Sequence, residues 1–489
     1  MAKKDIRPRY RFPEHGRDAE TLNTALREAG ERDASWKEGK TFSLVFYAGE
    51  EVSEVTRNAY DAYRYENGLN PTAFPSLRKF ENEVVSFTID LMHGDDDVVG
   101  NMTSGGTESI LCAVKAAHSW AKANKPGITA PEMVVPISVH PAFDKAAYYF
   151  GIKVVHVPVN PDDLRADVKA TEAAINSNTI MIVGSAPAYP HGVVDPIEEL
   201  AALALKNNLW MHVDACVGGY ILPWVERLGY TIPKFDYRVA GVVSMSMDLH
   251  KYGYSAKGGS CVLYKNSEMR KHQYFVYTGW TGGIYASPAV AGTRPGGAIA
   301  AAWAVLNFLG AEGYMRLAKD VMDATLKVRN AVDAIEGIHI IGKPHMCVVA
   351  IGSDKLPIFN IGDELSAKGY HIDRQQNPDS LHLTISWGNV KAIDQFILDL
   401  QEAVAVGRKF SLHNLQSQFT VGLVKTAGKV LSEEKMTKFT NFLAKMGGGD
   451  GPPKRTAAMY GMMGALPNKG DLDELILDML DGLNKPEKL

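Results

Sequence analysis

A lysine between two apolar runs is the first residue whose surroundings suggest chemistry. The segment V-V-S-M-S-M-D-L-H-K-Y-G-Y-S-A-K-G-G-S-C-V-L-Y covers residues 242–264, and its two ends are typical of buried strands. Lys251 lies between them, among polar residues that a core does not need. A desolvated lysine has a lowered pKa and can form a Schiff base with an aldehyde. Alternatively, the His-Lys pair lies on a surface turn, and this segment alone leaves both interpretations open.

Three further sets of residues that could do chemistry lie next to predicted strands or helices. Asp214 closes the run L-W-M-H-V-D, where a carboxylate could hold a proton on a heteroaromatic nitrogen. His140 stands where an imidazole could lie flat on a planar cofactor. The glycines of S-G-G-T precede a helical pattern, with Ser104 or Thr107 as the cap, and leave N–H groups free for a phosphate. For Asp214, a helix cap or a buried ion pair is the alternative explanation. Taken singly, His140 is more often a surface or cap residue, and the glycine pair more often belongs to a capped helix without a ligand.

The elements that would position these residues follow a regular alternation. Short apolar runs at 132–137, 152–159, 180–184, 209–213 and 239–245 are separated mostly by helical patterns of ~10–15 residues. This alternation predicts an α/β fold with a mainly parallel sheet and helices on both faces. In such sheets the binding residues gather at the carboxyl ends of the strands. The glycine pair, His140, Asp214 and Lys251 all fall at such ends, and together they match the parts that pyridoxal phosphate requires.

Composition bounds the class of protein. The 489 residues suffice for about three domains of ~150 residues, and 46% hydrophobic with 22% charged residues is typical of a globular chain. A net charge of −4 argues against a nucleic-acid binder or a basic membrane-surface protein. The four cysteines are far apart and form no zinc-type cluster, so we expect reduced thiols and no metal site. Without an apolar leader or ~18 uninterrupted apolar residues, we expect no membrane span and a cytoplasmic location.

The C-terminal half suggests a long loop and a second domain. Residues 279–297 contain so much glycine and proline that we predict neither strand nor helix there, and long loops in compact proteins tend to be functional. Predicted helices at 298–309 and 311–335, with short strands and another helix beyond, indicate a smaller α+β domain. We therefore predict an N-terminal arm at 1–56, a large cofactor-binding domain at 57–310, and a small C-terminal domain with a tail at 311–489.

Four motifs of this sequence resemble one enzyme family. They are G-G-T-E-S, H-V-D-A-C-V-G-G, D-L-H-K-Y-G-Y-S-A-K-G and G-G-I-Y-A-S-P-A-V-A-G-T-R-P-G-G. Together they resemble the sphingosine-1-phosphate lyases, which belong to the group II decarboxylase branch of the fold-type-I pyridoxal-phosphate enzymes. The likeness extends from about Phe42 to the tail motif A-A-M-Y-G-M-M-G. It implies a mainly parallel seven-stranded sheet flanked by helices, with a smaller α+β C-terminal domain.

The resemblance also implies a role for each matching residue. Lys251 would form the Schiff base with pyridoxal 5'-phosphate, Asp214 would pair with the pyridine nitrogen, and His140 would stack on the ring. The residues expected around the cofactor phosphate are Ser104, Gly105, Gly106, Thr107, His250 and Thr293. Those expected to transfer protons are Tyr47, Tyr189 and Lys257. A phenol with a pKa near ~10 needs a neighbouring cation to act as a base, and Lys257 could supply it.

The implied reaction is a retro-aldol cleavage of a phosphorylated sphingoid base between C2 and C3, which yields a long-chain aldehyde and phosphoethanolamine. The implied assembly is a homodimer with composite active sites, because the arm and the 279–297 loop lack a core of their own. Eukaryotic members carry a membrane-spanning N-terminus that this sequence lacks, which suggests a soluble bacterial form. Asn70 stands where eukaryotic members have histidine, and this leaves the contact to the substrate phosphate open.

Two other functions remain compatible with the sequence. The first is an amino-acid decarboxylase on the same scaffold, which would release carbon dioxide instead of an aldehyde. The second is a catalytically silent dimer that binds a partner, although the intact Lys251 and Asp214 argue against it.

Overall fold

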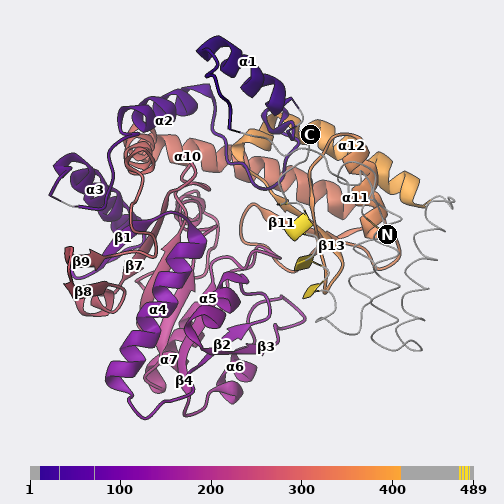
Figure 1. Ribbon diagram of the computed structural model, residues 1–489. Helices are drawn as coiled ribbons and strands as arrows, with labels where there is room; N and C mark the ends of the chain where they lie inside the picture. The colour runs from indigo at the N-terminus through magenta and orange to yellow at the C-terminus, as the bar shows by residue number, and fades with distance from the viewer. Residues whose placement is uncertain are drawn as a thin grey trace, which may run out of the picture.

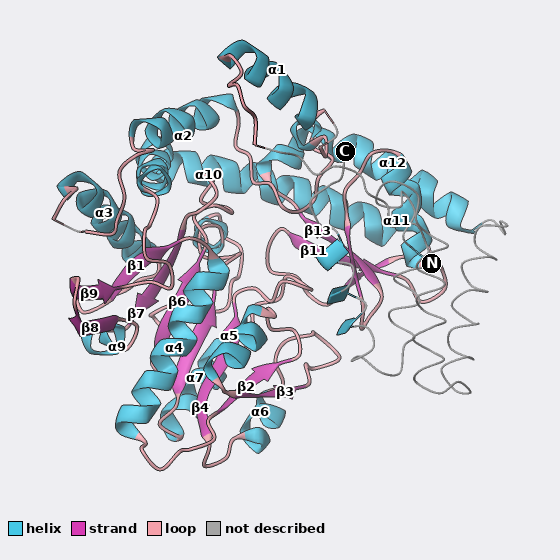
Figure 2. Cartoon of the chain, viewed as in Figure 1, coloured by secondary structure: helices cyan, strands magenta, loops and turns pink. Residues whose placement is uncertain are grey.

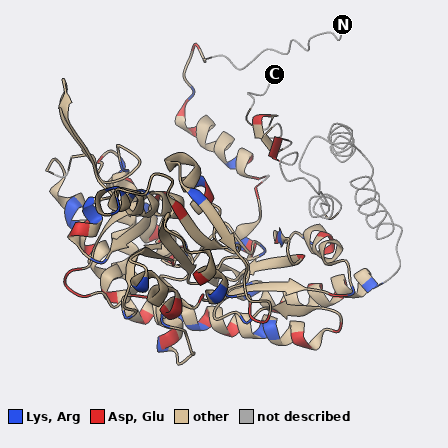
Figure 3. Cartoon of the chain, turned by 90° about the horizontal axis from the view of Figure 1, so that it is seen from below, with Lys and Arg blue, Asp and Glu red and all other residues tan. Residues whose placement is uncertain are grey.

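The computed structural model describes residues 12–408 apart from 32 and 71, together with tail positions 457, 473–474, 476–477, 480–482 and 484. The first eleven residues and nearly all of the tail motif A-A-M-Y-G-M-M-G lie outside the described part. The described chain forms a seven-stranded sheet, a four-stranded sheet and a two-stranded hairpin, with helices around them (Figures 1 and 2). Lys and Arg are interspersed with Asp and Glu over these elements (Figure 3).

The seven-stranded sheet is the centre of the large domain. Its strands are β1 (Val99–Thr103), β2 (Glu132–Pro136), β3 (Lys153–Val157), β4 (Thr179–Ser185), β5 (Trp210–Asp214), β6 (Val242–Met247) and β7 (Ser260–Tyr264). Their order in the sheet is β1-β7-β6-β5-β4-β2-β3, and only β7 runs against its neighbours. Every residue of β2, β4, β5 and β7 is buried, as expected for strands covered on both faces. The prediction of a mainly parallel sheet is confirmed.

Two apolar clusters lie on opposite faces of this sheet. Along β4, Ile182 belongs to one cluster while its neighbours Met181 and Val183 belong to the other, because successive side chains of a strand point to opposite faces. The helices that connect the strands contribute to these two clusters. They are α4 (Gly106–Asn124), α5 (Ala142–Phe150), α6 (Val168–Ala174), α7 (Ile197–Lys206), α8 (Leu222–Arg227) and α9 (Ser267–Lys271). The layers hold the carboxyl ends of the strands in fixed positions.

The longest helix, α10 (Gly296–Ala334), runs along both domains (Figure 1). It packs against α8 and two N-terminal helices, α2 (Glu50–Ala62) and α3 (Pro75–Leu91), whereas α1 (Ala19–Gly30) buries no residue. A kink at Gly310, with φ 53° and ψ −173°, joins the two helices predicted separately from the sequence. Within the described residues, α10 alone is long and apolar enough to cross a membrane by length and composition, a property that the core helices of globular proteins share.

A smaller α+β unit follows α10. Its antiparallel sheet has the order β10-β11-β13-β12. The elements are β10 (His339–Ile341), β11 (Val348–Gly352), α11 (Ile358–Ala367), β12 (Asp373–Gln375), β13 (Ser380–Thr384) and α12 (Ile393–Arg408). The N-terminal segment docks on this unit, since Phe42 N donates to His371 O at 3.0 Å and Thr384 N to Phe42 O at 2.7 Å. The kink at Gly310 coincides with our proposed boundary between the domains, while α2 continues through the boundary proposed at residue 56.

The prediction that residues 279–297 form neither strand nor helix is wrong. The structure has a hairpin of β8 (Phe275–Trp280) and β9 (Gly283–Ser287), and α10 begins at Gly296. Trp280 pairs with Gly283 across the turn, where φ of Gly283 is +110°. The glycines therefore make the turn that a tight hairpin needs rather than preventing regular structure.

The segment after β5 packs closely on the end of β4, and this contact can be tested by substitution. In Gly218→Ala, the new Cβ would lie 2.1 Å from the carbonyl oxygen of Ala186, which cannot move without shifting the backbone. We expect the free energy of unfolding to fall by about 1–3 kcal/mol. Denaturant unfolding measures this change, with Gly127→Ala as the control because no atom lies within 4 Å of its new Cβ. A Gly218→Ala protein as stable as the parent would contradict this packing.

Candidate active site

A cavity of about 360 Å³ lies where β5 and β6 end and α4 begins. It is lined by Ser104, Gly105, Gly106, Thr107, Glu108, Ile110, His140, Asp214, Cys216, Asp248, His250 and Lys251. All the residues predicted to bind the cofactor are therefore together here except Thr293. Thr293 lines a smaller neighbouring cavity of about 70 Å³, to which Ser104 also contributes.

The N-terminus of α4 forms one wall of this cavity. Gly105 is the N-cap residue and no side chain caps the helix, so the capping predicted for Ser104 or Thr107 is wrong. The Glu108 carboxylate reaches back instead and accepts a hydrogen bond from Ser104 N at 2.7 Å. A Cβ at Gly106 would lie 2.7 Å from Asp248 Oδ2 and 2.8 Å from Cys216 Sγ. Only glycine fits there, and the uncapped N–H groups of α4 suit an anionic group such as a phosphate.

Lys251 forms an ion pair inside the cavity. Its Nζ lies 2.9 Å from Asp248 Oδ2 in the turn that follows β6. Burial disfavours the ammonium charge, but the carboxylate of Asp248 and the further groups of Cys216 and Asp214 outweigh it, so the pKa of Lys251 is raised. The expectation of a lowered pKa is therefore wrong. The physical reason for the raised pKa is the ion pair with Asp248, three residues earlier, to which we assigned no role from the sequence.

Asp214 is buried at the end of β5, and neighbouring protein groups fix one of its carboxylate oxygens by hydrogen bonds. Its Oδ1 accepts hydrogen bonds from Cys216 N at 3.0 Å and from Ser246 Oγ at 3.4 Å. Ser246 Oγ also contacts His212 Nε2 at 3.1 Å, and burial lowers the pKa of His212 to about 4, so this imidazole is neutral. Asp214 Oδ2 accepts no hydrogen bond from the described residues, which suits a carboxylate whose partner is a group in the cavity.

Two imidazoles complete the walls. His140 Nδ1 accepts a hydrogen bond from Ala142 N at 3.1 Å, which leaves the proton of a neutral ring on Nε2. His250 Nε2 lies 3.6 Å from Asp248 Oδ2. His250 Nδ1 and Asp248 Oδ1 are both buried and have no hydrogen-bond partner among the described residues. Because buried polar atoms in proteins are almost always paired, these atoms fit a cavity that receives a polar group.

Tyr47 and Lys257 line a second cavity of about 510 Å³, formed mainly by apolar and aromatic side chains. Lys257 Nζ donates to the carbonyl oxygen of His250 at 3.3 Å, and this bond links the cavity to the first one. Burial and the charge of Lys251 lower the pKa of Lys257. Tyr47 donates to Glu50 Oε1 at 2.8 Å, and burial together with this carboxylate raises its pKa.

Tyr189 and Asn70 lie apart from these groups. The Tyr189 phenol donates to Asp373 Oδ2 at 3.0 Å and its ring lies 4.2 Å from that of His382, in the small sheet. Burial and the Asp373 carboxylate raise the pKa of Tyr189. Asn70 Oδ1 accepts hydrogen bonds from Thr72 N and Thr72 Oγ1, at 2.9 and 2.7 Å. Neither Tyr189 nor Asn70 lines a cavity described above.

The residues that sequence reasoning missed are the neighbours of the predicted ones. They are Glu108, Ile110, Cys216 and Asp248. The role of Asp248 could have been predicted, because a carboxylate three residues before a lysine can form an ion pair with it across one turn. No spacing rule pointed to Cys216, which reaches the cavity only because the chain turns sharply after β5.

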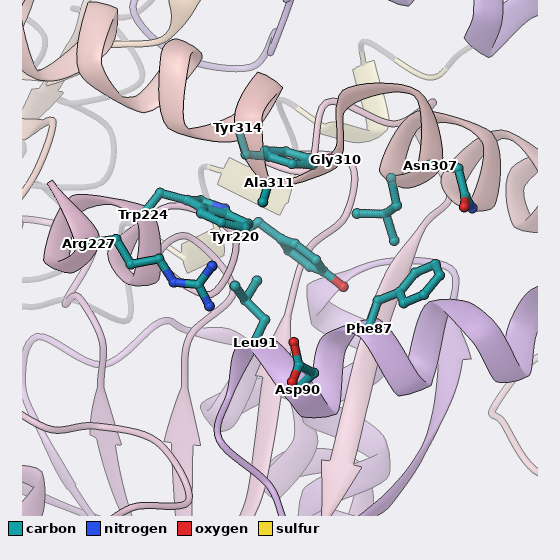
Figure 4. A pocket seen from close by; sticks show the side chains of 11 residues that line it. Phe87, Asp90, Leu91, Tyr220, Trp224, Arg227, Asn307, Gly310, Ala311 and Tyr314 are labelled. Carbon is teal, nitrogen blue, oxygen red and sulfur yellow. The ribbon is translucent and has the colours of Figure 1, made fainter.

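A third cavity of about 320 Å³ holds none of the predicted residues (Figure 4). It lies between α3, α8 and the kink of α10 at Gly310. Its floor is the stacked pair of Trp224 and Tyr314, with ring centroids 5.5 Å apart, and Asp90 and Arg227 stand at its edge. Its groups form no arrangement of lysine, acid and phosphate-binding backbone, so the first cavity is the better candidate for catalysis.

The fold and this site define a class. Residues 41–352 match the family model described as the pyridoxal-dependent decarboxylase conserved domain. This match and the seven-stranded sheet make the chain a fold-type-I pyridoxal-phosphate enzyme.

Comparison with individual proteins narrows the class to one family. The chain is 42% identical to the sphingosine-1-phosphate lyase of Arabidopsis thaliana over 96% of this chain and 80% of that protein. It is 46% identical to the lyase of Oryza sativa over 79% of this chain and 71% of that one. The solved lyase of Burkholderia pseudomallei superposes with a TM-score of 0.79 at 38% identity, covering 85% and 96% of the two chains. The chain belongs to the sphingosine-1-phosphate lyase family.

Removal of the cavity lysine tests the assignment of its role. We expect Lys251→Ala to abolish the visible absorbance of the bound cofactor and all turnover, because no other lysine lines this cavity. The fold should persist, since the flanking strands β6 and β7 carry the packing. Absorbance and circular dichroism spectra measure the two effects, with the exposed Lys265→Ala as the matched control. A Lys251→Ala protein with parental turnover would show that the cofactor is held elsewhere.

Proposed function

We propose that the protein cleaves a phosphorylated sphingoid base, such as sphingosine 1-phosphate, between C2 and C3 to a long-chain aldehyde and phosphoethanolamine. The observation that carries this proposal is the 42% identity to a named lyase over 96% of the chain, together with a cavity suited to pyridoxal phosphate. The runner-up, an amino-acid decarboxylase, rests on the family model, which describes a decarboxylase domain.

Each of the residues that line the cavity would have a separate role in the reaction. When bound, pyridoxal phosphate supplies an electron sink for the electron pair released as the C2–C3 bond breaks. Lys251 would anchor the cofactor, and the N–H groups at the start of α4 would hold its phosphate beside His250. Asp214 would keep a proton on the ring nitrogen through Oδ2, which accepts no hydrogen bond from the described residues. His140 would lie against the ring, with Nδ1 fixed by Ala142 N.

Proton removal from the C3 hydroxyl needs a base, and Lys257 is the candidate that the electrostatics favour. Its lowered pKa increases the fraction of neutral amine, whereas the pKa values of Tyr47 and Tyr189 are raised. Tyr47 lines the same cavity and would orient the substrate through its hydroxyl. Tyr189 would reach the substrate only if its bond to Asp373 opens.

We also propose a homodimer in the cytoplasm whose two sites each use groups from both chains. The hairpin of β8 and β9 supports this, since Phe275, Val276, Tyr277, Trp280 and Ile284 are each more than half exposed. A lone two-stranded hairpin is marginally stable in water, and an apolar surface of this size is typical of an interface. The chain leads directly from this hairpin to Thr293, so a second copy that covers the hairpin would lie close to a cofactor cavity.

One assay separates the proposed reaction from the alternatives. Purified protein loaded with pyridoxal phosphate is incubated with sphingosine 1-phosphate, and the aldehyde, phosphoethanolamine and carbon dioxide are quantified; amino acids are tested in parallel. We expect aldehyde and phosphoethanolamine in equal amounts. Carbon dioxide from an amino acid without aldehyde from the lipid would establish a decarboxylase, and a loaded protein inert in both assays would favour a silent scaffold.

Neutralising the acid after β5 should slow bond cleavage without preventing cofactor binding. An amide at Asp214→Asn cannot hold the proton on the ring nitrogen, and loss of one such charge in a dry site typically costs ~10²–10³ in rate. Steady-state rates and the cofactor spectrum check the two halves of this expectation. The matched control is Asp90→Asn, whose carboxylate lines the separate cavity of Figure 4. An unchanged rate in Asp214→Asn would place Asp214 outside the reacting groups.

Subunit exchange tests whether the sites are composite. We expect Lys251→Ala and Tyr47→Phe chains to be inactive alone and to regain partial activity when mixed, because a Tyr47 that completes the site of the partner chain, beyond lining the cavity of its own chain, gives one site of each mixed dimer both residues. The matched control mixes Lys251→Ala with Asp214→Asn chains, which line one cavity of a single chain and should not complement. Mixed dimers of the first pair that form but stay inactive would show that Tyr47 serves its own chain.

A further inference from the structure

Asp248 is a buried acid that the mechanism above does not use. Its side chain is 2% exposed, and Oδ2 lies 2.9 Å from Lys251 Nζ and 3.6 Å from His250 Nε2. The other oxygen, Oδ1, is buried without a hydrogen-bond partner among the described residues. A buried carboxylate with one unsatisfied oxygen is costly unless a nearby cation compensates it, and Lys251 is the cation in contact.

The position of Asp248 relative to α4 explains why it stays ionised there. Its two carboxylate oxygens lie 2.7 and 2.9 Å from the place that a Cβ of Gly106 would occupy, at the first residue of α4. The partial positive charge of a helix N-terminus stabilises an anion at this place. Although burial opposes ionisation, Lys251 and His250 outweigh it, and the pKa of Asp248 is lowered.

We propose that Asp248 is the positioning residue of Lys251: it holds the side chain as an ammonium ion facing the cavity until an aldehyde enters. This proposal rests on the assignment of Lys251 as the lysine that binds the cofactor. Asp248 acts through Lys251 and needs no contact with the substrate.

The other titratable groups around Lys251 lie beyond ion-pair distance or are held by other hydrogen bonds. They are His250 from the same turn, Asp214 and Cys216 after β5, Lys257 before β7, and Glu108 in α4. The Glu108 oxygens accept hydrogen bonds from Ser104 N and Ala291 N, and Asp214 Oδ1 is held by Cys216 N. Only Asp248 forms an ion pair with Lys251 among the described residues, so it dominates the charge state of the lysine.

The chemistry gives this arrangement a measurable consequence. A lysine attacks an aldehyde only as the neutral amine, so the ammonium ion must first release one proton to solvent. The nitrogen lone pair then bonds to the carbonyl carbon, and the carbonyl oxygen leaves with the two remaining N–H protons as water. Asp248 therefore delays this reaction in the free protein, and Lys251 should react with a simple aldehyde only at a higher pH than an exposed lysine does.

Lysine labelling in the cofactor-free full chain tests the proposal. The probe is pyridoxal, which lacks the phosphate; borohydride then adds hydride to the carbon of the new C=N bond, water protonates the nitrogen, and peptide mass spectrometry quantifies the label. We expect Asp248→Asn to increase labelling of Lys251 at pH 8 by about tenfold or more, which corresponds to a shift of at least one pH unit. Asp248→Glu, which keeps the charge, should restore the parental pH profile.

Two comparisons make the outcome decisive. Exposed Lys271 of the same protein reports the reactivity of an ordinary lysine. Asp214→Asn removes a carboxylate that forms no ion pair with Lys251 among the described residues and should have a smaller effect. Superimposable profiles for Asp248→Asn and the parent, or an equal shift in Asp214→Asn, would overturn the proposal. If Asp248→Asn does not fold, the parental protein alone tests the proposal. Labelling of its Lys251 at the same pH as Lys271 would contradict the proposal. If Lys251 is not the lysine that binds the cofactor, a different result shows it: the Lys251→Ala protein keeps its full cofactor absorbance.

Discussion

The ammonium group of Lys251 and the carboxylate of Asp248 lie 2.9 Å apart in one buried cavity, at the carboxyl ends of the central strands β5 and β6 of the seven-stranded sheet. Two charges removed from water are tolerated only when their geometry is fixed, because each alone would cost several kcal/mol. The surrounding structure supplies that geometry. Gly106 lets α4 approach the carboxylate, and the fully buried strands β5 and β7 fix the ends of the segments that carry Asp214 and Lys251.

The same constraint links the fold to the reaction. A cavity lined by backbone N–H groups, two imidazoles and three carboxylates suits a cofactor with a phosphate, an aldehyde and a basic ring nitrogen. The apolar cavity next to it, reached through the contact between Lys257 and His250, suits a different part of the substrate. In the proposed reaction, binding and bond cleavage would take place in adjoining cavities, and Lys257, which lies between them, has a lowered pKa that suits a proton acceptor.

The sequence predicted the large sheet and most of the cofactor cavity for one physical reason. Parallel strands end at a common edge, so residues that follow different strands, such as His140, Asp214 and Lys251, meet without being near in sequence. Prediction from the sequence failed where the outcome depends on side-chain geometry. The ion pair of Lys251 raises a pKa that burial alone would lower, and neither Ser104 nor Thr107 caps α4, whose first N–H groups no side chain caps. The hairpin was missed because glycine content reveals a turn only when its flanking strands are recognised.

If Lys251 holds the cofactor, it must yield the cofactor to the amine of the substrate. Borohydride reduction of the cofactor-loaded protein, followed by peptide mass spectrometry, shows which lysine is bonded to the cofactor. We expect a pyridoxyl label on Lys251 that disappears when sphingosine 1-phosphate is added before the reductant. A label on another lysine, Lys257 above all, or a label on Lys251 that the substrate does not displace, would contradict this expectation.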